Sequence, residues 1–317
     1  MNRMRIVVAL GGNAMTAPDG QARPQDQQAA VERTMPHVAA LVAAGHEVVV
    51  THGNGPQVGN LLVKNEIAAS VVPPVPLDWC DAQTQGTIGM LIMNALGRCL
   101  AEHGLEPRVA ALVSRTLVDP GDDAFAKPSK PVGRYLPKDE AAVLIAHGET
   151  WEDRGAKGWR RVVPSPEPRA CLDAGAARVL LEAGFVVTSG GGGGIPVVAE
   201  DGVPGGYRGV EAVVDKDLMA AVLADSLGAD ALIIATDVDA VMLGYETAAA
   251  VPLGGVRVAE LRKHAEAGEF PGGSMLPKVE AACRFAESAA GRFSVITSLE
   301  LIEDGLAARA GTVVTAP

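Results

Sequence analysis

Three lysines stand where loops rich in glycine or proline meet expected helices or strands, and each could place an ammonium group beside a phosphate. Lys216 follows an apolar run, Lys278 follows a glycine loop, and Lys130 lies in a proline-rich loop. Phosphoryl transfer relies on cations that neutralise the moving group and hold donor and acceptor in line. Taken alone, each lysine is as readily a solvated surface residue, but together they could surround a transferred phosphoryl group.

Carboxylates accompany these lysines. Asp215 and Asp217 flank Lys216 at the start of an expected helix, and Asp237 and Asp239 follow an expected strand in the segment TDVD. The second pair could hold the edge of a nucleotide or a water bound to Mg²⁺, with helix capping as the alternative.

Three glycine-rich turns follow expected strands: Gly11-Gly12-Asn13, Gly53-Asn54-Gly55 and Gly190 to Gly194. Glycine allows backbone N–H groups to approach an anion closely, and helix N-termini add positive potential. One such turn is most often ordinary turn chemistry, whereas three on neighbouring strands indicate a phosphate site. The sequence contains no GxxxxGK[ST], no GxGxxG and no protein-kinase HRD or DFG motif, so any kinase chemistry must use another scaffold.

Strands and helices alternate along most of the chain, which predicts an α/β fold with a doubly wound, mainly parallel sheet. The glycine turns would then meet beyond the carboxyl ends of the strands, where such sheets bind ligands. We expect strands at 5–10, 47–51, 108–114, 185–188 and 231–235, and helices at 25–44, 57–66, 81–103, 172–183, 216–227, 258–267 and from 277 onward.

The segment from about 115 to 168 interrupts this alternation. It is rich in proline and basic residues and shows no clear periodicity apart from one expected helix near 137–147. We interpret it as a lid subdomain inserted into an N-terminal lobe of residues 1–210. A C-terminal lobe would follow at 211–317.

Composition excludes several classes of function. The 27 Lys and Arg residues against 38 Asp and Glu residues give a net charge of −11, which disfavours nucleic acid and anionic membranes as partners. No apolar stretch approaches the roughly 20 residues that a membrane span needs. The 4 cysteines form no CxxC and the 6 histidines show no metal-binding spacing. We therefore expect a cytoplasmic protein and assign no zinc site.

Several ordered motifs together resemble those of the carbamate kinases, within the larger amino acid kinase group. The resemblance extends over nearly the whole chain. It rests on the segments ALGGNA (9–14), THGNGPQVG (51–59), QGTIG (85–89), KPVG (130–133), GGGGIPV (191–197), DKD (215–217), TDVD (236–239) and GSM (273–275).

The resemblance implies a three-layer αβα fold, a homodimer, and reversible phosphoryl transfer between carbamoyl phosphate and ADP with Mg²⁺. It implies that Lys130, Lys216 and Lys278 stabilise the phosphoryl group and that Asp217 orients them. Substrate binding would fall to Gly11, Gly12, Asn13, Gly53, Asn54, Gly55, Gly191 and Gly192. Nucleotide binding would fall to Asp215, Thr236, Asp237, Val238, Met242 and Met275.

The chain departs from the family pattern at four positions. One is Gly190, an extra glycine before the four-glycine run, where Cys or Ser is common. Met90 and Met242 stand where tyrosine is usual, and Leu276 replaces a common glycine in a loop that here resembles acetylglutamate kinases. Two alternatives follow: a kinase for another small carboxylate, and a binding protein for nucleotide or acyl phosphate that has lost turnover.

Overall fold

The computed structural model describes residues 3–16, 23–245, 247, 250–270 and 274–316. The part of the C-terminal glycine loop at 271–273, which the sequence singled out, lies outside these residues. Among the described helices, none has the length and apolar character needed to cross a bilayer.

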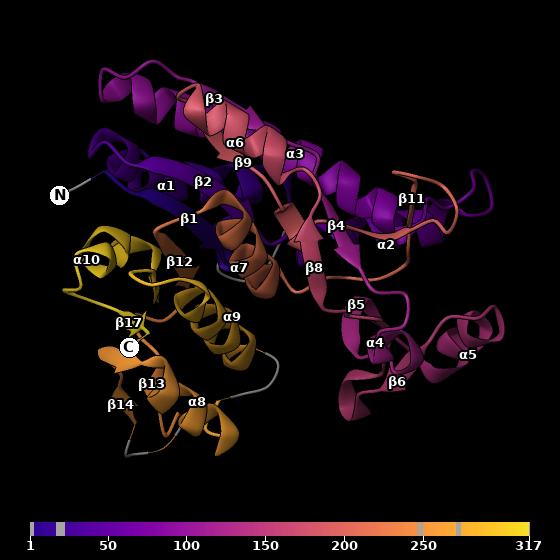
Figure 1. The fold of residues 1–317 in the computed structure, drawn as a ribbon. Helices are drawn as coiled ribbons and strands as arrows, with labels where there is room; N and C mark the ends of the chain where they lie inside the picture. Colours follow the sequence, from indigo (N-terminus) through magenta and orange to yellow (C-terminus); the bar gives the residue numbers. More distant parts are fainter. Residues whose placement is uncertain (1–2, 17–22, 246, 248–249, 271–273, 317) are drawn as a thin grey trace.

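An eight-stranded sheet forms the centre of the molecule, in the order β15-β17-β16-β12-β1-β2-β9-β3 (Figure 1). All neighbours in it are parallel except β16 and β17, which confirms the mainly parallel sheet. Its strands are β1 (Arg5–Leu10), β2 (Glu47–His52), β3 (Val109–Ala111), β9 (Val186–Thr188), β12 (Ala231–Thr236), β15 (Gly255–Arg257), β16 (Phe293–Ser298) and β17 (Thr312–Thr315).

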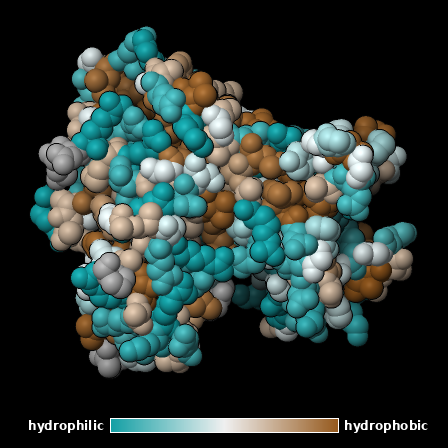
Figure 2. All heavy atoms as spheres, in the orientation of Figure 1, coloured by the Kyte–Doolittle hydropathy of each residue, from teal (hydrophilic) through white to brown (hydrophobic). Residues whose placement is uncertain are grey.

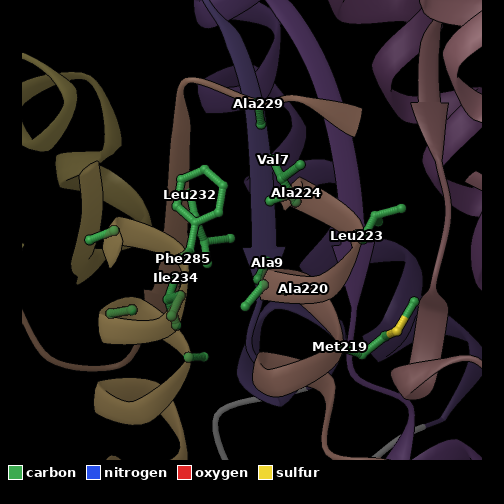
Figure 3. Packing of buried hydrophobic residues seen from close by; sticks show 14 of the residues in the cluster. Val7, Ala9, Met219, Ala220, Leu223, Ala224, Ala229, Leu232, Ile234 and Phe285 are labelled. Atoms are coloured by element: carbon green, nitrogen blue, oxygen red, sulfur yellow. The ribbon is translucent and has the colours of Figure 1, made fainter. Parts of the chain in front are cut away.

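Helices cover both faces of this sheet, because successive side chains of the buried strands point to opposite sides. On one face, Val7 and Ala9 of β1 pack with side chains of α7 and α9 (Figure 3). On the other, Ile6, Val8 and Leu10 pack against α1 and α3. The result is the expected three-layer αβα arrangement. The helices involved are α1 (Pro24–Ala43), α3 (Leu77–Glu102), α6 (Ala174–Glu182), α7 (Lys216–Leu227), α8 (Val258–Glu266), α9 (Met275–Ser288) and α10 (Ile302–Leu306).

The segment at 115–168 is more regular than its sequence predicts. The expected helix near 137–147 is confirmed as α5 (Lys138–Ala146), but the expectation of otherwise irregular chain is wrong. A three-stranded antiparallel sheet accompanies α5, in the order β5-β7-β6. These strands are short, half-exposed and rich in basic residues, so they carry no clear apolar alternation. They are β5 (Lys130–Leu136), β6 (Trp151–Asp153) and β7 (Trp159–Val163), with α4 (Asp123–Ala126) nearby.

This small sheet and its helices form a projection from the body of the protein, which we call the lid (Figures 1 and 2). The two ends of the 115–168 segment do not belong to it. β4 (Arg115–Val118) and β8 (Pro168–Cys171) pair with each other in a separate four-stranded sheet, together with β10 (Ile195–Ala199) and β11 (Tyr207–Gly209). The division of the chain into lobes at residue 210 stays a prediction.

The remaining elements are short. α2 (Gly55–Ala68) packs between the lid strand β5 and α3, and β13 (Met242–Leu243) pairs with β14 (Val251–Pro252). In the described part of the chain, 3₁₀ turns lie at Gly12–Met15, Gly155–Lys157, Gly191–Gly193 and Leu299–Leu301.

Candidate active site

Two partly buried lysines share one buried carboxylate at the start of α7. Asp217 is only 3% exposed, and its Oδ1 accepts a hydrogen bond from Lys216 Nζ while its Oδ2 accepts one from Lys278 Nζ at 3.0 Å. Lys278 lies in the first turn of α9, 61 residues away in the sequence. The packing of α7 against α9 therefore brings together two of the three lysines singled out in the sequence.

The third lysine reaches the same helix from the lid. Lys130 Nζ lies 3.0 Å from Oδ2 of Asp215, which is the N-cap residue of α7. The other oxygen of Asp215 accepts hydrogen bonds from the backbone N–H groups of Asp217 and Leu218. One aspartate thus caps α7 and anchors the lid lysine.

Electrostatics keep Asp217 ionised. Burial by itself would raise the pKa of this carboxyl, but the charges of Lys216 and Lys278 and their hydrogen bonds together hold the pKa below its usual value. Three lysines and two aspartates leave this cluster with one net positive charge, which suits an anion.

A small cavity of about 160 Å³ adjoins Lys216 and Lys278. It lies beyond the carboxyl ends of β1 and β12, where parallel sheets bind ligands. Its lining residues are Gly11, Gly12, Lys216, Ala235, Thr236, Asp237, Lys278 and Leu299. Two cations on a glycine-lined cavity give a place where a phosphoryl group could be held.

The first two glycine turns lie beside this cavity, but not all of their N–H groups are free for an anion. Gly11 N–H donates to Ala235 O and Gly53 N–H to Leu10 O, both at 3.1 Å. These two amides continue the strand ladder. Gly12 and Asn13 begin a 3₁₀ turn. Gly55 is the first residue of α2 and lines a second cleft, together with Asn54 and Lys130.

Side chains from three elements hold the third glycine turn. Thr51 Oγ1 donates to Gly190 O at 2.9 Å, Thr116 Oγ1 to Gly193 O at 2.8 Å, and Gln85 Nε2 to Gly191 O at 2.8 Å. Gly191 and Gly192 are both buried. The turn is therefore fixed rather than free to adapt.

A glycine is required at position 192. Its φ of +70° is unfavourable for other residues, and an added Cβ would lie 2.2 Å from Asn54 Nδ2. We expect Gly192→Ala to lower kcat/KM for the phosphoryl donor at least tenfold by displacing Asn54. Steady-state kinetics would measure it, with Gly175→Ala as control, because no atom lies within 4 Å of a Cβ there. Equal kinetics in the two variants would contradict this.

Sequence reasoning missed four buried polar residues around these turns. They are His52, Asp81, Thr84 and Gln85. The last three lie on the inward face of α3, at a helical spacing that places them on one side. Polar side chains on the apolar face of a helix were the available signal.

Burial lowers the pKa of His52 to about 4. The hydrogen bond to Gly53 O raises this pKa and the charge of Lys216 lowers it further, but burial has the largest effect. The imidazole is therefore neutral at pH 7.

Burial raises the pKa of Asp81 to about 8, which the nearby Asp78 reinforces and the hydrogen bond from Asn54 opposes. Unfolded chains release this proton near pH 4. The folded state therefore binds more protons between pH 4 and pH 8, and the free energy of unfolding falls as pH rises through this window.

We expect Asp81→Asn to remove this pH dependence. The free energy of unfolding of the variant, relative to that of wild type, should rise by on the order of 5 kcal/mol from pH 4 to pH 8. Urea unfolding at several pH values would measure the difference. His52 contributes equally to both proteins and cancels. Parallel pH curves for the two proteins would show that Asp81 titrates at its ordinary value.

Only some of the residues that the resemblance assigns to the nucleotide lie at the small cavity. Thr236 and Asp237 line the small cavity with the two lysines that share Asp217, and Thr236 Oγ1 donates to Asp237 Oδ1 at 3.0 Å. Val238 follows them along the chain. Met242 is half-buried in β13, and Met275 packs on the core at the start of α9, so neither lines this cavity.

Comparisons with known proteins agree with this geometry. The model of the amino acid kinase family matches residues 4–297. Carbamate kinase 1 of Enterococcus faecium is 43% identical over 93% of this chain and 94% of its own length. The carbamate kinase of Pyrococcus furiosus is 42% identical over 97% and 98%. A solved carbamate kinase from Giardia lamblia, bound to AMP-PNP, superposes with a TM-score of 0.93 at 37% identity, with 99% of each chain covered. The chain therefore belongs to the amino acid kinase family and, within it, to the carbamate kinases.

Proposed function

We propose that this phosphotransferase catalyses the reversible reaction of carbamoyl phosphate with ADP to give ATP and carbamate. The bond between phosphorus and the carbamoyl oxygen breaks, and a bond from phosphorus to a β-phosphate oxygen of ADP forms. Carbamate then decomposes to ammonia and CO₂. The observation that carries the proposal is the pair Lys216 and Lys278 on one buried carboxylate, at a phosphate-sized cavity lined by glycine.

Lys216, Lys278 and Lys130 would neutralise the charge of the transferred phosphoryl group. Asp217 would hold the first two at a fixed separation, so they need no reorganisation during the reaction. Because carbamate carries its own anionic nucleophile and carbamoyl phosphate has a good leaving group, no covalent intermediate and no strong general base is needed.

The acyl phosphate would bind at the turns of Gly11, Gly12, Asn13, Gly53, Asn54, Gly55, Gly191 and Gly192. The nucleotide would bind on the side of Asp215, Thr236, Asp237, Val238, Met242 and Met275. The bound AMP-PNP of the Giardia lamblia relative supports a nucleotide site in this fold. The N-terminal lobe would then hold the acyl phosphate, the C-terminal lobe the nucleotide, and the lid would contribute Lys130.

We treat Mg²⁺ as part of the nucleotide substrate. The described residues contain no group of three or more His, Cys, Asp or Glu side chains placed to hold a metal ion. Asp215 and Asp217 are already paired with lysines. Phosphate oxygens and water would supply the ligands of Mg²⁺, as is usual for this ion.

We further propose a cytoplasmic homodimer. Four free cysteines suit a reducing compartment. Ile67, Val71 and Trp79, near the junction of α2 and α3, are 74%, 83% and 60% exposed. Covering them in a dimer would remove apolar surface from water. Light scattering of the purified protein would measure the oligomeric state.

ATP formation from Mg-ADP and carbamoyl phosphate tests the proposed reaction, after subtraction of spontaneous carbamoyl phosphate decay. Synthesis that depends on Lys216 would establish it. No ATP above background, from folded protein that still binds ADP, would exclude the reaction. It would favour another acyl acceptor or a protein without turnover.

A further inference from the structure

The side-chain amide of Asn54, in the second glycine turn, is held in one orientation by α3. Its Nδ2 donates to Asp81 Oδ1 at 3.0 Å and to Thr84 Oγ1 at 2.9 Å. Thr84 gives its own hydroxyl hydrogen to Asp81 O at 2.8 Å, so Oγ1 can only accept from Asn54. A flipped amide would place its oxygen against the Thr84 hydroxyl oxygen, which has no hydrogen left to donate, and this fixes the assignment.

The remaining polar atom of this amide is its carbonyl oxygen, Oδ1. Both hydrogens of Asn54 Nδ2 are used, and the hydrogen bonds of this side chain among the described residues involve Nδ2 and not Oδ1. The amide lies against Gly192, and Asn54 lines a cleft of about 470 Å³ together with Gly55 and Lys130. An oriented carbonyl oxygen is thus available beside the proposed acyl phosphate site.

Asp81 lowers the stability of the folded protein at this position. It is 2% exposed, and its Oδ2 is buried with no hydrogen-bond partner among the described residues. A buried polar atom without a partner destabilises a fold, so such groups concentrate where function requires them. Among the described residues, the side chain hydrogen-bonded to the other oxygen of Asp81, Oδ1, is that of Asn54. We therefore assign to Asp81 the role of orienting the Asn54 amide, in spite of its cost in stability.

We infer that Asp81 and Thr84 are positioning residues that turn Asn54 Oδ1 toward the substrate, where it accepts a hydrogen bond from the amino group of carbamoyl phosphate. This inference rests on the proposed function and adds a basis for specificity. Acetyl phosphate has a methyl group in place of the amino group. It would leave the acceptor oxygen unpaired, and sites built for a hydrogen bond reject such analogues.

The test compares carbamoyl phosphate with acetyl phosphate as donors in ATP synthesis, by wild type and by Thr84→Val. We expect kcat/KM for carbamoyl phosphate to fall about tenfold in T84V, mainly through KM. The value for acetyl phosphate and the KM for ADP should stay within about twofold of wild type. Thr84→Ser keeps the hydroxyl and should restore the preference. Thr87→Val is the matched control, because Thr87 is exposed on the same helix.

Asp81 is tested by a second pair of variants. Asp81→Asn retains an oxygen that can accept from Asn54 and should keep most of the preference for carbamoyl phosphate. Asp81→Leu removes that acceptor together with the buried carboxyl. Urea unfolding would show whether it folds, and the folded variant should lose the preference even if T84V does not fold.

Two outcomes would overturn the inference while leaving the proposed function intact. One is an equal loss with both donors in T84V, which is the mark of a merely structural role. The other is an unchanged preference in D81L. A wild-type protein that makes no ATP from either donor would instead remove the proposed function, and the inference with it.

Discussion

Replacing Lys216 with alanine is expected to lower kcat for ATP formation by about a hundredfold or more, with little change in the KM for ADP. Loss of one preorganised electrostatic contact to a transition state typically has an effect of this size. Lys216 is expected to show it because its ammonium group is held by Asp217 at the cavity that Gly11 and Gly12 line. Stopped or coupled assays of ATP formation would measure the change.

Lys263 provides the control for this experiment. It lies exposed near the end of α8, so Lys263→Ala removes the same charge from the surface. Its kcat should stay near that of wild type. A Lys216→Ala variant with a wild-type kcat would remove the proposed role of Lys216 in catalysis.

Replacing Asp217 with asparagine is expected to lower both stability and activity. The change removes the only negative charge that Lys216 and Lys278 share in the described structure and leaves two partly buried ammonium groups without it. Removing one partner of a buried ion pair costs about 3 kcal/mol or more in the free energy of unfolding. Because the lysines then lose their fixed positions, kcat should also fall at least tenfold.

Urea unfolding and steady-state kinetics would measure these two effects. Asp225→Asn on the same helix is the control, since Asp225 is exposed and pairs with Arg292 at the surface. Surface ion pairs contribute about 0–1 kcal/mol. Asp217 and Asp225 variants of equal stability would show that the charge of Asp217 contributes no more to the free energy of unfolding than a surface charge does.

The pH dependence of Asp217 has a defined sign. Its folded pKa lies below the unfolded value, so its contribution to stability is present above the unfolded pKa and is lost as pH falls through the folded value. Asp81 acts in the opposite direction between pH 4 and pH 8. The two aspartates would therefore be separable by their pH profiles.

Local sequence determined most of the central elements. The expected helix at 216–227 has the bounds of α7, because Asp215 caps its start and Gly228 ends it in the left-handed conformation. The strand at 5–10 is confirmed as β1. Apolar runs that end in glycine specify such strands through short-range preferences, which need no knowledge of the partners.

Only the tertiary structure decided which distant residues meet. Lys130 is 85 residues from Asp215, and Lys278 is 61 residues from Asp217, so no local pattern could pair them. The strands of the lid were missed because half-exposed basic strands carry no apolar alternation. The orientation of Asn54 by Asp81 and Thr84 was also beyond the sequence, because hydrogen bonds between different elements depend on how helices pack on the sheet. The sequence thus determined which chemical groups are present, and packing determined which of them act together.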